Sequence, residues 1–215
     1  MNDGRGRFIT FEGGEGVGKS LVSSRVASYL RAQHGIDCDT SREPGGTGLA
    51  QRVRELFSDQ DSDEAWTMVA EACLVSAARA QHVQYRIMPN LKSGRWVLCD
   101  RFADSTRVYQ GILGGVRTGF LEDLIKESTF GLQPDLSFVL DCEVEVSQNR
   151  LRQRSSSGAA RYDGADLDWH RKLRAAYLDL VDRDPHRFVV IDASQPVEEV
   201  EQQVLAVIMQ RFPEI

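Results

Sequence analysis

Residues Phe8–Ser20 read FITFEGGEGVGKS, and this stretch decides the fold. It joins an apolar run, Phe8–Phe11, to a glycine-rich segment, Gly13–Ser20, that matches the pattern GxxxxGK followed by Ser or Thr. Glycines let backbone N–H groups turn inward around phosphate oxygens, and a helix that begins at the end of the loop adds positive potential. A strand, a glycine-rich loop and a helix in this order predict a binding site for the phosphates of a nucleoside triphosphate.

The loop residues have distinct expected roles. Lys19 would reach the β- and γ-phosphates of ATP, and the Ser20 hydroxyl would bind Mg²⁺. Glu15 is unusual, because a carboxylate beside a triphosphate is electrostatically unfavourable. We expect it to point away and accept a hydroxyl group of a second ligand; the alternative is a solvent-facing residue. The expected phosphate-binding set is Gly13, Gly14, Glu15, Gly16, Val17, Gly18, Lys19 and Ser20.

Short apolar runs alternate with amphipathic stretches along the rest of the chain. The runs are too short and too rich in β-branched and aromatic residues for helices, so they predict buried parallel strands. These predicted strands are Phe8–Phe11, Ile36–Thr40, Trp96–Cys99, Leu136–Leu140 and Phe188–Ile191. The predicted helices are Lys19–Gln33, Asp63–Met88, Thr118–Phe130, Val144–Arg154, Leu167–Asp184 and Val197–Phe212. This alternation predicts an α/β fold with a five-stranded parallel sheet flanked by helices.

Acidic residues follow four of the predicted strands: Glu12, Asp100, Asp141 and Asp192. Ligands of open parallel sheets bind at the carboxyl ends of the strands, so we expect some of these side chains to face the active cleft. Asp100 is a candidate Mg²⁺ residue, acting through a bound water, and its alternative role is to bind nearby backbone. Asp192 follows the last strand, and we expect it to be structural.

Composition excludes several classes of protein. The chain has 215 residues and a formal net charge of −6, which suits one domain over residues 1–215 and argues against a general nucleic-acid binder. The cysteines and histidines form no CxxC or HExxH spacing, which argues against disulfides and zinc. No apolar run approaches the roughly 18 residues that span a bilayer, and the N-terminus lacks the apolar segment of a secretory signal. We expect a cytoplasmic protein without a membrane partner.

Arginine dominates the basic residues. Of 26 Lys and Arg residues only four are lysines, and the planar guanidinium is the better group for bidentate phosphate contacts. Some arginines follow strands, and others surround the low-complexity segment Ser155–Ala160: Arg42, Arg101, Arg150, Arg152, Arg154 and Arg161. Two basic clusters that face one cleft from different sides are what an enzyme needs to transfer a phosphoryl group from one phosphate to another. We therefore expect a mobile lid at about residues 150–164; the alternative is an exposed loop.

Several further motifs resemble those of bacterial thymidylate kinases. They occur in the family's order from residue 8 to about 195, and they are SREPGGT (Ser41–Thr47), ARAQH (Ala78–His82), CDRF (Cys99–Phe102), DSTRVYQG (Asp104–Gly111) and QPDL (Gln133–Leu136) with Leu140–Asp141. The resemblance implies a three-layer P-loop kinase fold in the nucleoside monophosphate kinase family. It also implies phosphoryl transfer from ATP to dTMP in dTTP synthesis, a requirement for Mg²⁺, and a homodimer.

The resemblance also assigns roles at matching positions. Glu15 would accept the 3′-hydroxyl of the deoxyribose, Arg101 would hold the dTMP phosphate, and Arg79 would bind the base. The remaining dTMP-binding candidates are Arg42, Ser105, Thr106 and Tyr109. Residue 16, after Glu15, is glycine, which places the chain with the class whose catalytic arginine lies in the lid. The catalytic candidates are Lys19, Arg101, Arg152, Arg154 and Arg161.

One position departs from the family. Four residues before Arg79, where an aromatic ring usually stacks on thymine, this sequence has Val75. Aromatic stacking is worth roughly 1–3 kcal/mol per base in nucleic-acid sites, so the departure bears on selectivity for the base and not on the phosphate chemistry.

Two alternatives remain open. The first is a kinase for another nucleoside monophosphate or for a deoxynucleoside; a nucleoside would need a base such as Glu12 or Glu15, whereas a monophosphate is already mostly dianionic at pH 7. The second is an ATP-dependent switch or assembly protein. The small residues Ala70, Ala72, Ala77 and Ala78 also favour close helix–helix packing in a dimer.

Overall fold

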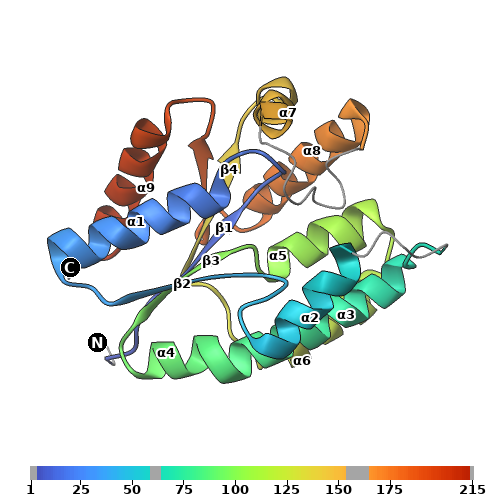
Figure 1. Ribbon diagram of the computed structural model, residues 1–215, viewed down its shortest axis with the longest axis horizontal. Helices are drawn as coiled ribbons and strands as arrows, with labels where there is room; N and C mark the ends of the chain where they lie inside the picture. The colour runs from blue at the N-terminus through green and yellow to red at the C-terminus, as the bar shows by residue number, and fades with distance from the viewer. Residues whose placement is uncertain (1–3, 59–63, 154–164, 214–215) are drawn as a thin grey trace.

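The computed structural model describes residues 4–58, 64–153 and 165–213. Its sheet has five parallel strands in the order β2–β3–β1–β4–β5 (Figure 1). The strands are β1 (Phe8–Glu12), β2 (Cys38–Arg42), β3 (Trp96–Asp100), β4 (Leu136–Asp141) and β5 (Phe188–Asp192). The predicted α/β class and the five strands are confirmed. Each observed strand continues one or two residues past its predicted end, to a charged residue.

The strand that leads into the glycine-rich loop lies at the centre of the sheet. β1 pairs with β3 and β4, and all five of its residues are buried. A central parallel strand is covered on both faces, which explains why Phe8–Phe11 is apolar without alternation. The register places Phe11 beside Asp100 and Glu12 beside Val139. The loop after β1 therefore emerges between the carboxyl ends of β3 and β4.

Helices cover both faces of the sheet. α1 (Lys19–His34) and α9 (Val197–Arg211) lie on one side, and α3 (Met68–His82), α4 (Met88–Lys92) and α6 (Thr118–Thr129) lie on the other (Figure 1). The first side buries Ile9 and Phe11 against α1 and α9, and the second buries Phe8 and Val97 against α3, α4 and α6. α8 (Leu167–Arg183) packs against β4. This arrangement gives the expected three layers.

The predicted helix Asp63–Met88 is wrong in extent. α3 begins only at Met68, where the Thr67 side chain accepts a hydrogen bond from the Ala70 N–H. A π-helical turn, Val83–Ile87, then connects α3 directly to α4. Pro89 does not end the helix, because it lies in the first turn of α4, where its missing N–H is tolerated.

Three helical segments that the sequence analysis did not predict lie near the carboxyl edge of the sheet. They are α2 (Gly48–Ser58), α5 (Ala103–Thr106) and the π-helical segment η2 (Arg107–Leu113). α7 (Val144–Gln153) ends beside the predicted lid, of which residues 154–164 lie outside the described part of the chain. None of the described helices is long and apolar enough to cross a bilayer.

Candidate active site

The glycine-rich loop adopts a conformation that requires glycine at specific positions. Gly13 has φ 126°, and a Cβ there would lie 2.5 Å from the Leu140 carbonyl oxygen. Gly16 has φ 77°, and its Cβ would lie 2.3 Å from the Ser147 carbonyl oxygen. Both the left-handed backbone and the close approach of neighbouring chain exclude other residues. The loop is thus seated against β4 and α7.

Lys19 begins α1 and folds back over the loop. Its Nζ donates to the carbonyl oxygens of Gly13 at 3.1 Å and Gly14 at 2.5 Å. Burial, together with the positive charge of Arg101, lowers the pKa of the Lys19 ammonium to about 8. The loop therefore holds a desolvated cation at the point where phosphate oxygens would enter.

Ser20 and Asp100, the two predicted Mg²⁺ residues, lie together. The Ser20 hydroxyl donates to Asp100 Oδ2, and Asp100 Oδ1 is buried with no hydrogen-bond partner within the described ranges. A hydroxyl and a carboxylate are hard oxygen ligands of the kind that Mg²⁺ takes alongside phosphate and water. No cluster of three or more His, Cys, Asp or Glu side chains that could hold a metal occurs among the described residues. These two residues fit a metal shared with a bound nucleotide.

Arg101 follows β3 in a left-handed conformation with φ 66°. Its backbone N–H donates to the Phe11 carbonyl, which turns the side chain towards the glycine-rich loop. Nη1 donates to the Gly13 carbonyl at 3.0 Å and to the Tyr177 hydroxyl at 2.9 Å, and Nη2 donates to Glu15 Oε1 at 3.1 Å. Arg101 thus joins the loop to α8.

Glu15 points into the protein, so its alternative as a solvent-facing residue is wrong. Its side chain is 9% exposed, and Oε1 accepts hydrogen bonds from Arg101 and, at 2.5 Å, from the Tyr109 hydroxyl. Burial opposes ionisation, but the charges of Arg101 and Lys19 outweigh it and hold the pKa of the Glu15 carboxyl below its ordinary value. Oε2 is buried without a hydrogen-bond partner in the described structure. Glu15 therefore places an ionised carboxylate at the edge of the neighbouring cavity, which it helps to line.

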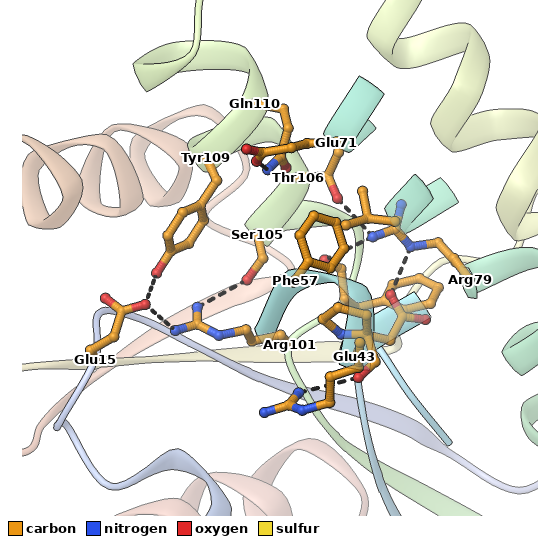
Figure 2. A pocket seen from close by; sticks show the side chains of 14 residues that line it. Glu15, Glu43, Phe57, Glu71, Arg79, Arg101, Ser105, Thr106, Tyr109 and Gln110 are labelled. Atoms are coloured by element: carbon orange, nitrogen blue, oxygen red, sulfur yellow. Dashed lines mark hydrogen bonds and ion pairs between the residues drawn. The ribbon is translucent and has the colours of Figure 1, made fainter. Parts of the chain in front are cut away.

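That cavity has a volume of about 180 Å³ and lies between the loop, α2, α3, α5 and η2 (Figure 2). It is lined by six of the seven predicted dTMP-binding residues: Glu15, Arg79, Arg101, Ser105, Thr106 and Tyr109. The seventh, Arg42, is exposed at the end of β2 and lines a separate depression that also contains Ser20 and Asp100.

Arg79 forms the buried end of the cavity, and its side chain is 2% exposed. Nε donates to Glu43 Oε2 at 2.8 Å and Nη2 donates to Thr106 Oγ1 at 2.7 Å. The guanidinium lies over the Phe102 ring at 5.4 Å, while Nη1 is buried with no hydrogen-bond partner in the described ranges. A buried guanidinium N–H without an acceptor is costly, so this donor marks a place for a ligand oxygen.

Glu43 is held by a chain of hydrogen bonds from two sequence motifs. Its Oε1 lies 3.0 Å from His82 Nδ1, and His82 Nε2 lies 2.7 Å from Ser41 Oγ. Gly46 packs against this chain, since a Cβ there would lie 2.3 Å from His82 Cδ2. The motifs SREPGGT and ARAQH thus form one unit that orients Arg79.

Three cavity residues lie outside every motif of the sequence analysis: Arg54, Phe57 and Glu71; Gln110 lies in the motif DSTRVYQG but had no predicted role. Arg54 Nη1 donates to the Pro44 carbonyl at 3.2 Å, and burial together with the charge of Arg42 lowers the Arg54 pKa. Gln110 Nε2 donates to Glu71 Oε2 at 3.0 Å, and both side chains are buried. Had α2 been predicted as a helix, the spacing of Arg54 and Phe57 would have placed both on one face.

The predicted lid arginines are only partly described. Arg150 Nη1 donates to the Ala193 carbonyl at 2.6 Å, so it fastens α7 to the loop after β5. Arg152 is exposed near the end of α7, and Arg154 and Arg161 lie outside the described residues.

The remaining acidic strand ends have other partners. Asp141 forms a bidentate pair with Arg174, at 2.8 and 2.9 Å. Asp192 binds the Ser194 N–H and the Gln195 amide, and these hydrogen bonds lower its pKa to about 2. Asp192 is therefore structural, as expected.

Known proteins share both the sequence and the fold. The thymidylate kinase family profile matches residues 11–204. The thymidylate kinase of Nitrobacter hamburgensis is 45% identical over 96% of this chain and 90% of its own length, and that of Caulobacter vibrioides is 42% identical over 97% and 98%. A crystal structure of thymidylate kinase from Ehrlichia chaffeensis has a TM-score of 0.76 at 29% identity, covering 95% of this chain and 99% of that one. The chain belongs to the thymidylate kinase family.

Proposed function

We propose that the protein transfers the γ-phosphoryl group of ATP to dTMP, giving dTDP and ADP, with Mg²⁺. One observation carries the proposal beyond family membership: Lys19 Nζ and Arg101 Nη1 donate to the same Gly13 carbonyl oxygen, at 3.1 and 3.0 Å. Lys19 belongs to the loop that would hold the donor phosphates, and Arg101 belongs to the acceptor cavity. Two cations that converge on one point favour the meeting of two phosphate groups there.

The cavity offers a polar partner for each part of dTMP. Its phosphate would lie against Arg101 and Arg54, and its 3′-hydroxyl would donate to Glu15 Oε2. The base would lie at the far end, where Arg79 Nη1 would donate to a carbonyl oxygen. The buried, unpartnered atoms on Glu15 and Arg79 support this order.

The transfer needs positioning and charge neutralisation more than acid–base catalysis. The acceptor phosphate is mostly dianionic at pH 7, so its oxygen can attack the γ-phosphorus without a general base. Lys19 would neutralise the donor phosphates, and Arg101 would fix the attacking phosphate in place. Ser20 and Asp100 would hold Mg²⁺, which supplies further charge neutralisation between the donor phosphates. Arg152, Arg154 and Arg161 are the proposed lid residues.

We also propose a homodimer that forms through α3. Val69 and Cys73 are exposed and lie one turn apart on this helix, and Trp66, just before the helix, is exposed as well. Ala72 and Ala78 face the protein's own core instead, so the predicted alanine stripe is only partly available. Sedimentation at micromolar concentration should give twice the monomer mass; a monomer would contradict the proposal.

Cytoplasmic location and the lack of a nucleic-acid partner stay predictions.

An ADP-release assay with ATP, Mg²⁺ and a panel of acceptors tests the function. The panel contains dTMP, dUMP, dCMP, dGMP, UMP and thymidine. We expect turnover with dTMP, and loss of it in Lys19→Ala without loss of folding by circular dichroism. Val75 favours one alternative, a kinase with broader base selectivity, which equal turnover of several monophosphates would support. ADP release that does not depend on an acceptor would contradict both.

A further inference from the structure

Val75 stands at the position that a base-stacking aromatic residue usually occupies. Other aromatic rings nevertheless line the cavity. Three aromatic residues line the cavity: Phe57, Phe102 and Tyr109. A pyrimidine binds well against a ring face that it can cover, because every base has a π-face. Which of the three rings can take that role depends on how deeply each is buried.

Phe102 and Tyr109 are committed to other contacts. Phe102 is 1% exposed, meets Phe8 edge to face at 4.9 Å, and has the Arg79 guanidinium over its ring. Tyr109 is 8% exposed, holds Glu15 through its hydroxyl, and has the Arg101 guanidinium 5.1 Å from its ring centre. Both rings therefore support the arginines and the acid of the site.

Phe57 is different in burial and in origin. It is half-buried and comes from α2, which packs against α3, the helix of Val75 and Arg79. Phe57 lies three residues after Arg54, so the two side chains share one face of α2, and both line the cavity. In the view of Figure 2 the Phe57 ring lies between Arg101 and Arg79, which are the phosphate and base ends of the proposed dTMP site.

We propose that Phe57 supplies the aromatic surface for the acceptor base and that Val75 forms the small wall which leaves room for it. In this protein the base-stacking role has moved from α3 to α2. The inference rests on the proposed function, because it names the residue that would recognise the base of dTMP. It makes Phe57 and Val75 a complementary pair, in which one large and one small side chain share the space around the base.

The pair makes a test by exchange possible. Phe57→Leu should raise KM for dTMP roughly 5- to 50-fold with little change in kcat, because stacking holds the base and not the transferring phosphate. Val75→Phe alone should also raise KM, since two rings would crowd the cavity. The double variant Phe57→Leu/Val75→Phe should recover at least half of the lost affinity, on a logarithmic scale. Leu56→Ala, at the exposed neighbouring position, is the matched control.

Three results would overturn the inference. They are an unchanged KM for dTMP in Phe57→Leu, a Val75→Phe variant that binds dTMP better than wild type, and a double variant whose increase in KM is the product of the increases in the two single variants. Thermal unfolding of each variant, and its KM for ATP, separate loss of folding from loss of the base contact. Wild-type turnover distinguishes the two proposals. If the wild type does not phosphorylate dTMP, the function fails; if it does and Phe57→Leu behaves like Leu56→Ala, only the role of Phe57 fails.

Discussion

Glu43 and Arg79 form an ion pair that is almost wholly buried: Arg79 Nε donates to Glu43 Oε2 at 2.8 Å, and the side chains are 4% and 2% exposed. The pair fixes the position of the guanidinium at the buried end of the acceptor cavity. Glu43→Gln should lower the free energy of unfolding by on the order of 2–3 kcal/mol, because it leaves a buried cation without its counterion. It should also raise KM for dTMP more than KM for ATP.

Denaturant unfolding and steady-state kinetics check this prediction. The control is Glu55→Gln, which changes an exposed carboxylate on α2. Equal unfolding free energies in the two variants would show that Arg79 does not depend on Glu43.

Nucleotide binding should depend on pH through Lys19. Its pKa of about 8 means that the side chain is charged below pH 8 and loses its charge above it. Bound phosphates stabilise the charged form, so binding at pH 8 to 9 should take up a proton. The affinity for a non-hydrolysable ATP analogue should fall from pH 7 to pH 9.5.

Calorimetry in buffers with different ionisation enthalpies measures the proton uptake directly. Lys19→Met should bind the analogue weakly and show less uptake. If wild type and Lys19→Met take up the same number of protons on binding the analogue at pH 8.5, a group other than Lys19 takes up the proton.

Glu12 should make the protein less stable as the pH rises. Burial, and then the charge of Asp104, raise its pKa to about 8, although the carboxyl accepts a hydrogen bond from the Phe102 N–H. The folded state therefore binds a proton that the unfolded state releases near pH 4.5, so this contribution is full below that pH and is lost as the pH approaches and passes 8. Glu12→Gln imitates the protonated form and should flatten the dependence.

Melting temperatures from pH 5 to pH 9 test this sign. We expect Glu12→Gln to exceed the wild type above pH 8, while Glu127→Gln, at an exposed position of α6, follows the wild type. A wild type that becomes more stable than Glu12→Gln between pH 7 and 9 would show that Glu12 is ionised in the folded protein.

Glu15 should recognise the 3′-hydroxyl of the acceptor. Removing this hydroxyl from dTMP should weaken binding to the wild type by about tenfold or more, which is the usual magnitude for a hydrogen bond to a charged group. In Glu15→Gln the same change in the ligand should have a much smaller effect. A double-mutant cycle between residue and ligand, measured by calorimetry, gives the coupling, and additive effects would place the hydroxyl elsewhere.

The arginines around the lid should separate into two groups. At least one of Arg152→Ala, Arg154→Ala and Arg161→Ala should lower kcat by about 10³-fold, because an arginine that stabilises the transferring phosphoryl group has an effect of this size. Arg150→Ala should lower the melting temperature and leave kcat nearly unchanged, since Arg150 binds the carbonyls of Ala193 and Ser194. Full kcat in all three of the first group would contradict a lid arginine.

The sequence predicted best where local pattern and spatial position coincide. Phe8–Ser20 contains its strand, its loop and the start of α1 within thirteen consecutive residues, so its geometry could be predicted from the pattern alone. α2 was missed because it starts at Gly48, a poor helix former, two residues after the glycine pair Gly45–Gly46. Arg54 and Phe57 were missed together with α2, because their approach to the cavity depends on the packing of α2 against α3.

Other differences come from tertiary partners that local patterns do not specify. The position of Asp141 at a strand end suggested that its side chain faces the cleft. Instead, both of its carboxylate oxygens accept hydrogen bonds from Arg174 of α8. Pro89 suggested the end of a helix, but the π-helical turn before it lets the chain continue to Lys92.

The close approach of Gly46 to His82 also restricts how this protein can change. The imidazole fills the volume where any side chain at position 46 would begin, and the same ring joins Ser41 to Glu43. A larger residue at position 46 therefore requires a smaller one at position 82, which in turn removes the hydrogen bond that supports Glu43. A library that randomises position 46 while His82 is kept should therefore return almost only glycine.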